Sequence, residues 1–363
     1  MGHSFLKLLF IVVICIFPAL NCSENLSVNP NTSGETDQNE NHYNGTETIY
    51  NVKYNSYSKK VFAVGSDGLI IVSSDSGKTW EKIESNVNNF LSDITFLDES
   101  KQIVIGESGL ILTTEDEGSK WSKTELETPA WLQSISKIDE STLFIVGEEV
   151  TIRSTNSGKT WNPVVIDTSG YFVDICFIDE KVGYAIADVQ DPYKTIDGGL
   201  SWERDTTKHI PMWNSITIRS DGKPFIVGYG YFGSISSGVI NGVYGTFSNI
   251  KGLVLSLSDI VWTNTYVPGG PVSSEKYNVK TFNTYMALHD IEFHDNKNGA
   301  IVGAGGRILI TDDGGATWEN VENSFSTTFY TVCYLNSKII IACGSGGIIV
   351  RSDNGGRSWS VIN

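Results

Sequence analysis

The chain has 363 residues, 40% of them hydrophobic, which is enough to bury the core of one large domain or of two ordinary ones. Its formal charge is −16, and its arginines form no basic patch in the sequence. A partner held by its phosphate backbone, nucleic acid above all, is therefore excluded on electrostatic grounds.

Residues 1–22 have the pattern of a signal peptide. Lys7 precedes an apolar run over residues 8–17, which is too short for a membrane span but suits a signal-peptide core. Cys22 ends the segment "ALNC", which resembles a bacterial lipoprotein processing site, although Asn21 is larger than the Ala or Gly expected there. We expect an exported protein that is either attached to a membrane through a lipidated Cys22, as in an outer-membrane lipoprotein, or is periplasmic or secreted.

Residues 23–48 are predicted to form a disordered acidic linker. This stretch contains acidic residues but no Lys or Arg, and it is rich in Asn, Ser and Thr. It is too polar to pack as a core.

From residue 49 onward the dominant signal is an internal repeat. Trp80, Trp121, Trp161 and Trp202 are spaced by 41, 40 and 41 residues, and Trp318 and Trp359 are again 41 apart. This period is typical of propeller blades. The gap of 116 residues between Trp202 and Trp318 is close to three periods, which suggests that two copies have decayed.

Each period has the same internal order, as in "DITFLDESKQIVIGESGLILTTEDEGSKW" from Asp93: alternating apolar residues, a polar turn, a β-rich run, a Gly turn and a third run. This order predicts four short antiparallel strands per repeat, and hence an all-β β-propeller over residues 49–363. Repeats begin near Ile49, Asn89, Trp131, Tyr171, Trp213, Tyr285 and Thr328, which predicts seven blades, with eight as the alternative. Residues 243–282 are either an insertion in the fifth blade or a degenerate blade.

The recurring Trp closes a box of the form Ser/Thr, any, Asp/Asn, any, Gly, any, Thr/Ser, Trp. Its carboxylate or amide can accept N–H bonds inside its own turn, Gly supplies a positive φ, and the Trp covers the hairpin. The pattern resembles the Asp-box of the bacterial neuraminidase repeat. Identical turns dispersed around a ring do not converge on one point, so we assign the boxes a structural role: Asp75, Gly77, Trp80; Asp116, Gly118, Trp121; Asn156, Gly158, Trp161; Asp197, Gly199, Trp202; Asp313, Gly315, Trp318; Asn354, Gly356, Trp359.

Taken with the surrounding order of strands and turns, as in "DIEFHDNKNGAIVGAGGRILITDDGGATWENV", the chain resembles the photosystem II stability/assembly factor family. The resemblance implies a seven-bladed propeller without enzymatic activity that binds partner proteins during assembly. The family's basic patch is carried in part by Arg residues near the blade turns, and Arg307 is the nearest match here, with Arg153 and Arg351 before two boxes.

Two sets of side chains are predicted to surround the channel mouth. Aromatic residues precede the first strand of each blade and could hold a sugar or an extended peptide, or else seal gaps between blades: Phe90, Trp131, Tyr171, Trp213, Tyr285 and Phe329. At the start of the same strands lie Asp93, Ser134, Asp174, Ser215, Asp290 and Thr331. The carboxylates Asp93, Asp174 and Asp290 could bind a cation or act as paired acids, or could cap strand-entry turns.

Neither a cofactor nor a metal ion is expected. His289, Glu292 and His294 occur together in one blade only, which favours structural roles for them. The Cys residues of the predicted propeller are an odd number without CxxC spacing, so we expect free buried thiols. In "TVCYLNSKIIIACG", a two-residue turn would pair Cys333 with Ile340 and place Cys343 on the opposite face.

Two functions remain open at this point. One is a monomeric, non-catalytic scaffold that binds a partner protein or carbohydrate at the propeller channel face. The other is a glycoside hydrolase of the sialidase type, which shares the Asp-box propeller but needs three Arg to clamp the substrate carboxylate. Outside the box hairpins the sequence offers Arg204, Arg219 and Arg307, and no Arg-Ile-Pro segment precedes the first blade.

Overall fold

The computed structural model describes residues 42–127, 129–164, 166, 171–188, 192–204, 212–231, 250–256, 278–281 and 287–362. Within these residues the strands form four-stranded antiparallel sheets, each built from strands that are consecutive in the chain. Apolar residues are buried on both faces of these sheets, so each sheet must pack against its neighbours.

The sheets, each written from its first strand to its fourth, have the following bounds: β1 (Ile49–Asn55), β2 (Lys60–Gly65), β3 (Ile70–Ser73), β4 (Glu81–Ile83); β5 (Leu91–Phe96), β6 (Gln102–Gly106), β7 (Leu110–Thr114), β8 (Ser122–Glu125); β9 (Leu132–Lys137), β10 (Leu143–Gly147), β11 (Val150–Ser154), β12 (Asn162–Pro163); β13 (Phe172–Phe177), β14 (Gly183–Ala187), β15 (Tyr193–Thr195), β16 (Glu203–Arg204); β17 (Met212–Ile218), β18 (Pro224–Tyr231), β19 (Ile250–Ser256), β20 (Asn278–Thr281); β21 (Leu288–Phe293), β22 (Gly299–Gly303), β23 (Ile308–Thr311), β24 (Glu319–Asn320); β25 (Phe329–Tyr334), β26 (Ile340–Gly344), β27 (Ile349–Ser352), β28 (Ser360–Val361). Short 3₁₀ turns join the second and third strands in four of the sheets: η1 (Ser66–Gly68), η2 (Glu107–Gly109), η3 (Ala304–Gly306) and η4 (Ser345–Gly347).

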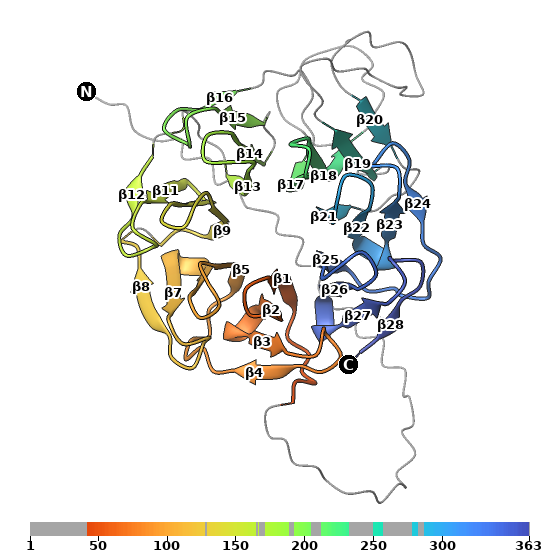
Figure 1. The fold of residues 1–363 in the computed structure, drawn as a ribbon, viewed down its shortest axis with the longest axis horizontal. Helices are drawn as coiled ribbons and strands as arrows, with labels where there is room; N and C mark the ends of the chain where they lie inside the picture. The colour runs from red at the N-terminus through yellow and green to blue at the C-terminus, as the bar shows by residue number, and fades with distance from the viewer. Residues whose placement is uncertain are drawn as a thin grey trace, which may run out of the picture. The chain divides into compact units, whose positions relative to one another are not determined.

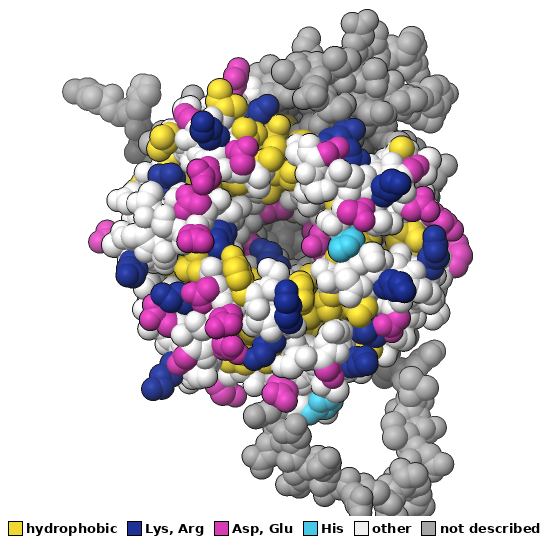
Figure 2. Space-filling view, in the orientation of Figure 1, with side chains coloured by type: hydrophobic (Ala, Val, Ile, Leu, Met, Phe, Trp, Pro, Cys, Tyr) yellow, Lys and Arg dark blue, Asp and Glu magenta, His cyan; other side chains and the backbone are white. Residues whose placement is uncertain are grey.

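The first strands of neighbouring sheets contact one another in chain order from β1 to β25, and β25 contacts β1. They line the centre of the ring, and the fourth strands lie at its rim (Figure 1). The face in Figure 2 is hollowed at the centre of the ring, and side chains of both charges surround the opening. The predicted all-β propeller of four-stranded antiparallel blades is confirmed.

The described strands account for the region in which the repeat pattern breaks. β17 to β20 form one sheet between the fourth and the sixth, and β19 and β20 lie inside residues 243–282. The described strands of this region therefore belong to a single sheet, the fifth. Residues 232–249 and 257–277 fall outside the described ranges, so the number of blades stays a prediction.

The predicted linker ends earlier than Thr48. Tyr43 is buried in a cluster that contains Trp80 of the first sheet and Ile341 of the last. The Tyr43 N–H donates to the Trp80 carbonyl at 2.8 Å, and its hydroxyl donates to the Glu47 carbonyl at 3.3 Å. The prediction of a disordered linker is wrong for residues 42–48, because one aromatic side chain gives this polar segment something to bury. Residues 23–41 lie outside the described ranges.

The cysteine register also differs from the prediction. β25 pairs with β26 so that Cys333 lies opposite Ile341 and Thr331 lies opposite Cys343. Because Thr331 and Cys333 are two residues apart, both thiols lie on one face of the sheet, and both belong to the same core cluster. The turn is longer than predicted, closed by the Leu335 N–H on the Ile339 carbonyl. Free thiols are confirmed for Cys176, Cys333 and Cys343.

The Asp-boxes are self-closed turns, as predicted. In the first box, Asp75 Oδ1 accepts the N–H groups of Lys78 and Thr79, each at 2.9 Å, and Oδ2 accepts the Thr79 hydroxyl. Partial burial raises the pKa of Asp75, but these hydrogen bonds outweigh it, and the pKa lies below its usual range. Trp80 is 1% exposed. The aspartate therefore satisfies N–H groups of its own turn while Trp80 joins the core.

Each box also ties its blade to the preceding one. Gly77 has a φ of +81°, and a Cβ added there would lie 2.2 Å from Cδ1 of Ile341 in the last sheet. The glycine at the same place in other boxes meets an apolar side chain of the preceding sheet in the same way, as Gly199 meets Phe144. Glycine is required for the turn and for this close approach.

We predict that Asp75→Ala lowers the free energy of unfolding by about 1–2 kcal/mol, because N–H groups of the turn lose their acceptor. Urea unfolding followed by circular dichroism measures this. The control is Ser74→Ala in the same turn, whose exposed side chain lies beside the network. Equal effects of the two substitutions would contradict the assigned role.

Candidate functional site

Three aspartates from alternate blades hold the centre of the ring together. Asp93 lies on β5, Asp174 on β13 and Asp290 on β21, each directly after a bulge in its strand. The predicted equivalence of these positions with Ser134, Ser215 and Thr331 is correct, because each pairs with its second strand in the same register. We call these six residues, together with Lys53, the central belt.

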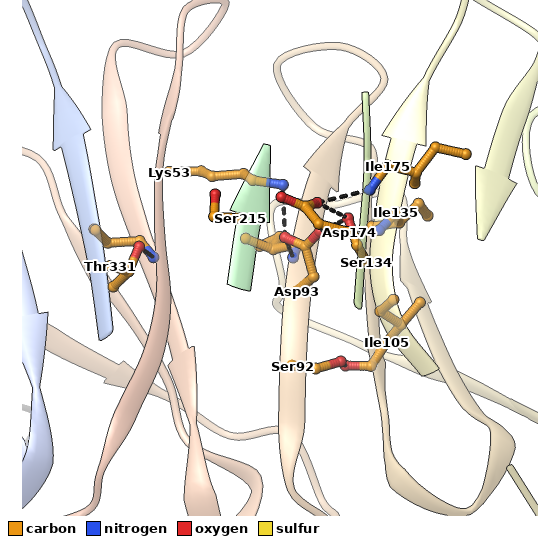
Figure 3. A network of polar contacts seen from close by, with 12 residues as sticks. Lys53, Ser92, Asp93, Ile105, Ser134, Ile135, Asp174, Ile175, Ser215 and Thr331 are labelled. Carbon is orange, nitrogen blue, oxygen red and sulfur yellow. Dashed lines mark hydrogen bonds and ion pairs between the residues drawn. The ribbon is translucent and has the colours of Figure 1, made fainter. Parts of the chain in front are cut away.

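Every aspartate of the belt links its own blade to the blades on both sides. Asp93 accepts the Lys53 ammonium from β1 at 2.6 Å and the Ile135 N–H from β9 at 2.9 Å. Figure 3 shows Lys53 reaching from its strand toward this carboxylate and Ser134 lying between Asp93 and Asp174.

The other two aspartates repeat this arrangement with a hydroxyl in place of the ammonium. Asp174 accepts the Ser134 hydroxyl at 2.7 Å and the Ile216 N–H at 2.8 Å. Asp290 accepts the Ser215 hydroxyl at 2.8 Å and the Val332 N–H at 2.9 Å. Thr331 then accepts the Val52 N–H of the first blade at 3.2 Å. The belt therefore runs once around the ring.

Burial of these carboxylates changes their acidity. Burial raises the pKa of Asp174 to about 6, with smaller contributions from the charges of Asp93 and Asp290, although hydrogen bonds from Ile216 and Ser134 oppose it. Burial also raises the pKa of Asp290. The belt concentrates negative charge where solvent stabilises it poorly.

Glu292 lies two residues beyond Asp290 on the same strand. One of its oxygens accepts the Tyr334 N–H at 2.7 Å. Burial, helped by the charge of Asp290, raises its pKa to about 8, although the Tyr334 N–H and the charge of Lys53 act in the opposite direction. Glu292 is therefore largely protonated at neutral pH, a state that the sequence did not predict.

The histidines near this carboxylate pack against aromatic rings, His294 stacked on Tyr334 and His289 tilted against Tyr330. His289 lies 5.2 Å from Tyr330, and His294 lies 5.7 Å from Tyr334, between ring centroids. Burial lowers the pKa of His289 to about 4. No cluster of three or more metal-ligating side chains occurs among the described residues.

The predicted aromatic residues divide into three groups. Phe90, Trp131 and Tyr171 directly precede β5, β9 and β13, as predicted. Trp213 and Phe329 are placed wrongly by the prediction: they lie inside β17 and β25, one position further along, with exposures of 6% and 0%. Tyr285 lies outside the described residues.

Instead, aromatic rings from five neighbouring blades form a continuous series. Tyr50 at the bulge of β1 lies 3.9 Å from Phe90, and Phe90 lies 5.0 Å from Trp131. On the other side Tyr50 lies 5.2 Å from Tyr330, which contacts His289. We call these five residues the aromatic arc. Tyr50 and Tyr330 could be found from sequence only by knowing where each first strand bulges.

The arc lies at the end of the sheets where the first strands begin, which we call the entry face. In an antiparallel meander, the turn between the second and third strands lies at this same end, and the box turn lies at the opposite end. The boxes are thus separated from the arc by the length of a strand.

Three of the arginines make hydrogen bonds within the fold. Arg307 donates to Asn320, Arg219 donates to the Gly314 carbonyl of the next blade at 2.6 Å, and Arg351 donates to the Ser76 carbonyl across the junction of last and first blades at 2.9 Å. Arg351 is buried. The arrangement offers no three-arginine clamp among the described residues.

We predict that stability falls as pH rises from 5 to 8 and that Glu292→Gln reduces this fall. Between the usual pKa of a glutamate and about 8, the folded chain keeps a proton that the unfolded chain releases, so folding is disfavoured by rising pH. Each unit of pKa corresponds to about 1.4 kcal/mol, so the difference between the two proteins should be of the order of 2–4 kcal/mol. Unfolding free energies at pH 5 and pH 8 measure it.

The control is Glu319→Gln, an exposed carboxylate on β24 of the same blade. It should leave the pH dependence of the wild type unchanged. A parallel decline of stability in wild type and Glu292→Gln would show that the proton is not held at Glu292.

Several solved structures share this fold. The solved structure of YCF48 bound to a D1 peptide has a TM-score of 0.63 at 18% identity, over 86% of this chain and 95% of that one. YCF48 from Cyanidioschyzon merolae has a TM-score of 0.63 at 16% identity, over 85% and 96%. The GH74 xyloglucanase from Xanthomonas campestris also has a TM-score of 0.63, at 11% identity over 88% of this chain but 55% of the enzyme. At these identities the likeness shows the fold alone.

No curated protein sequence matches the chain. Among the described residues, no helix is long and apolar enough to cross a membrane. The family model described as photosynthesis system II assembly factor YCF48 matches residues 23–113, 79–169 and 271–363, which together make up more than half of the chain. The chain therefore belongs to the YCF48 family of photosynthesis system II assembly factors.

Proposed function

We propose that this protein is an exported, non-catalytic, seven-bladed scaffold that binds a partner protein at the aromatic arc. The observation that carries the proposal is the continuous contact of five rings from five blades at the entry face. Half-buried rings in series offer apolar area and π faces to a ligand.

The family and one structural relative support a protein partner. The family model describes an assembly factor, and one YCF48 structure holds a D1 peptide. A carbohydrate at the same rings is the alternative ligand. Export is supported by the signal-peptide pattern of residues 1–22. Membrane fractionation of the wild type and of Cys22→Ser separates a lipid-anchored protein from a periplasmic or secreted one.

We predict that Phe90→Ala together with Trp131→Ala abolishes capture of the native partner by the purified full chain. The expected loss is more than tenfold, because aromatic anchors dominate binding energy at interfaces. Quantitative mass spectrometry of cross-linked complexes from the native envelope measures it.

The matched control replaces exposed apolar residues at the box end, with Ile196→Ser and Leu200→Ser. These side chains are 69% and 67% exposed, and they lie in the box turn of the fourth sheet. The control should keep the partner. If the partner is still captured by the arc variant but is lost from this control variant, the binding site lies on the opposite face.

Glycoside hydrolysis is the second candidate, because the propeller is shared with a xyloglucanase. Against it, both oxygens of Asp93, Asp174 and Asp290 accept hydrogen bonds that join blades. We predict that the protein turns over neither fluorogenic sialosides nor β-glucosides above the buffer rate. Turnover that Asp93→Asn or Asp290→Asn abolishes, in a variant that remains folded, would establish the enzyme instead.

A further inference from the structure

One backbone hydrogen bond recurs at the entry face of the blades. The first residue after the second strand donates its N–H to the carbonyl of the residue that precedes the first strand. The second, third and fourth sheets show it between Glu107 and Phe90, Glu148 and Trp131, and Asp188 and Tyr171, at 3.0, 2.9 and 2.7 Å. We call these three combinations the aromatic–acid pairs.

The same hydrogen bond occurs in three other sheets with small residues. It joins Ser66 to Thr48, Ala304 to Ala287 and Ser345 to Thr328, at 2.9, 3.0 and 3.0 Å. The backbone geometry is therefore compatible with side chains of any kind. The aromatic and acidic residues in three consecutive blades are not required by the fold.

Two of the carboxylates interact with an aromatic residue, Glu107 through the Phe90 backbone and Glu148 through the Tyr171 hydroxyl of the next blade. Glu107 Oε1 accepts the Phe90 N–H at 2.9 Å, and Phe90 contacts Trp131. The charge of Glu148 and its hydrogen bond to the phenol raise the pKa of Tyr171, with a smaller effect from Glu149. Tyr171 is 39% exposed. Negative charge thus lies beside accessible ring surface.

The loops at this end of the three blades carry charge of one sign. The described residues of these loops, 84–90, 106–109, 126–127, 129–131, 147–149, 164, 166, 171, 188 and 192, contain six Asp or Glu and no Lys or Arg. At the box end of the same blades, residues 97–101, 115–121, 155–161 and 178–182 include Lys101, Lys120, Lys159 and Lys181. The same box-end ranges also contain seven Asp or Glu, so charges of both signs occur there, whereas the described residues of the entry-face loops include no Lys or Arg.

We propose that the three aromatic–acid pairs form a docking surface for an extended polypeptide segment that carries Lys or Arg side chains. A cation is attracted both by the face of an aromatic ring and by a carboxylate beside it. Three pairs on adjacent blades suit side chains that project at intervals from one strand-like ligand. This inference rests on the proposed scaffold function and specifies the chemistry of its ligand.

The test uses the full chain and two fluorescein-labelled peptides, a nonapeptide of Gly-Ser-Lys repeats and the same peptide with Glu for Lys. Fluorescence anisotropy at low salt should show the Lys peptide binding at least about tenfold more tightly. Glu107→Gln with Glu148→Gln should weaken binding about threefold to tenfold, and Trp131→Leu should weaken it similarly without changing the charge.

The control for diffuse electrostatic attraction is Glu319→Gln with Glu81→Gln, which removes two exposed charges from rim strands of other blades and should leave binding unchanged. Equal binding of both peptides, or equal loss in this control, would overturn the inference. If the native partner depends on Phe90 and Trp131 while the Lys peptide does not bind, the scaffold function stands and only the cationic ligand is wrong. If the arc substitutions leave capture of the native partner unchanged, the proposed scaffold function itself is wrong.

Discussion

The ring depends on the three aspartates of the central belt. Burying a carboxylate costs free energy unless the group is hydrogen-bonded. Here the oxygens of each aspartate accept hydrogen bonds from the preceding and the following blade. Asp93 joins the first three blades, Asp174 joins the third to the fifth, and Asp290 joins the fifth to the seventh sheet. Thr331 on the last sheet then accepts the Val52 N–H of the first. No described strand is exchanged between the first sheet and the last. Side-chain contacts therefore close the ring, with Tyr43 and Arg351 packed across the same junction.

The boxes form a second, outer tie at the opposite end of the strands from the entry face. Each box glycine allows its turn to approach the preceding blade, and the hydrogen bonds of the box keep that turn rigid. Belt and boxes together fix neighbouring blades at two places, near the centre and near the box end. The loops of the entry face are left outside both ties, so their side chains can differ from blade to blade without opening the ring.

Sequence alone is informative where the blades are alike. The Trp period, the box and the positions of Asp93, Asp174 and Asp290 all repeat, so each copy supports the others. It fails where a local irregularity shifts the register. Trp213 and Phe329 stand two residues before Ser215 and Thr331, and not three as Phe90 does before Asp93, so they lie within the paired strand and in the core. A longer turn puts Cys333 and Cys343 on one face. Packing of Tyr43 in a polar segment depends on a partner surface made by residues near both ends of the propeller.

What the blades do not share is the better guide to function. A constraint from the fold acts on every blade alike, as the common backbone bond at the entry face shows: Thr48, Ala287 and Thr328 satisfy it as well as Phe90, Trp131 and Tyr171 do. The fold therefore does not explain why aromatic and acidic residues are concentrated in three adjacent blades, and we attribute this concentration to binding of a ligand. Because the loops that carry Glu107 and Glu148 contain no basic residue, the surface that these carboxylates form with the rings is complementary to positive charge on a partner.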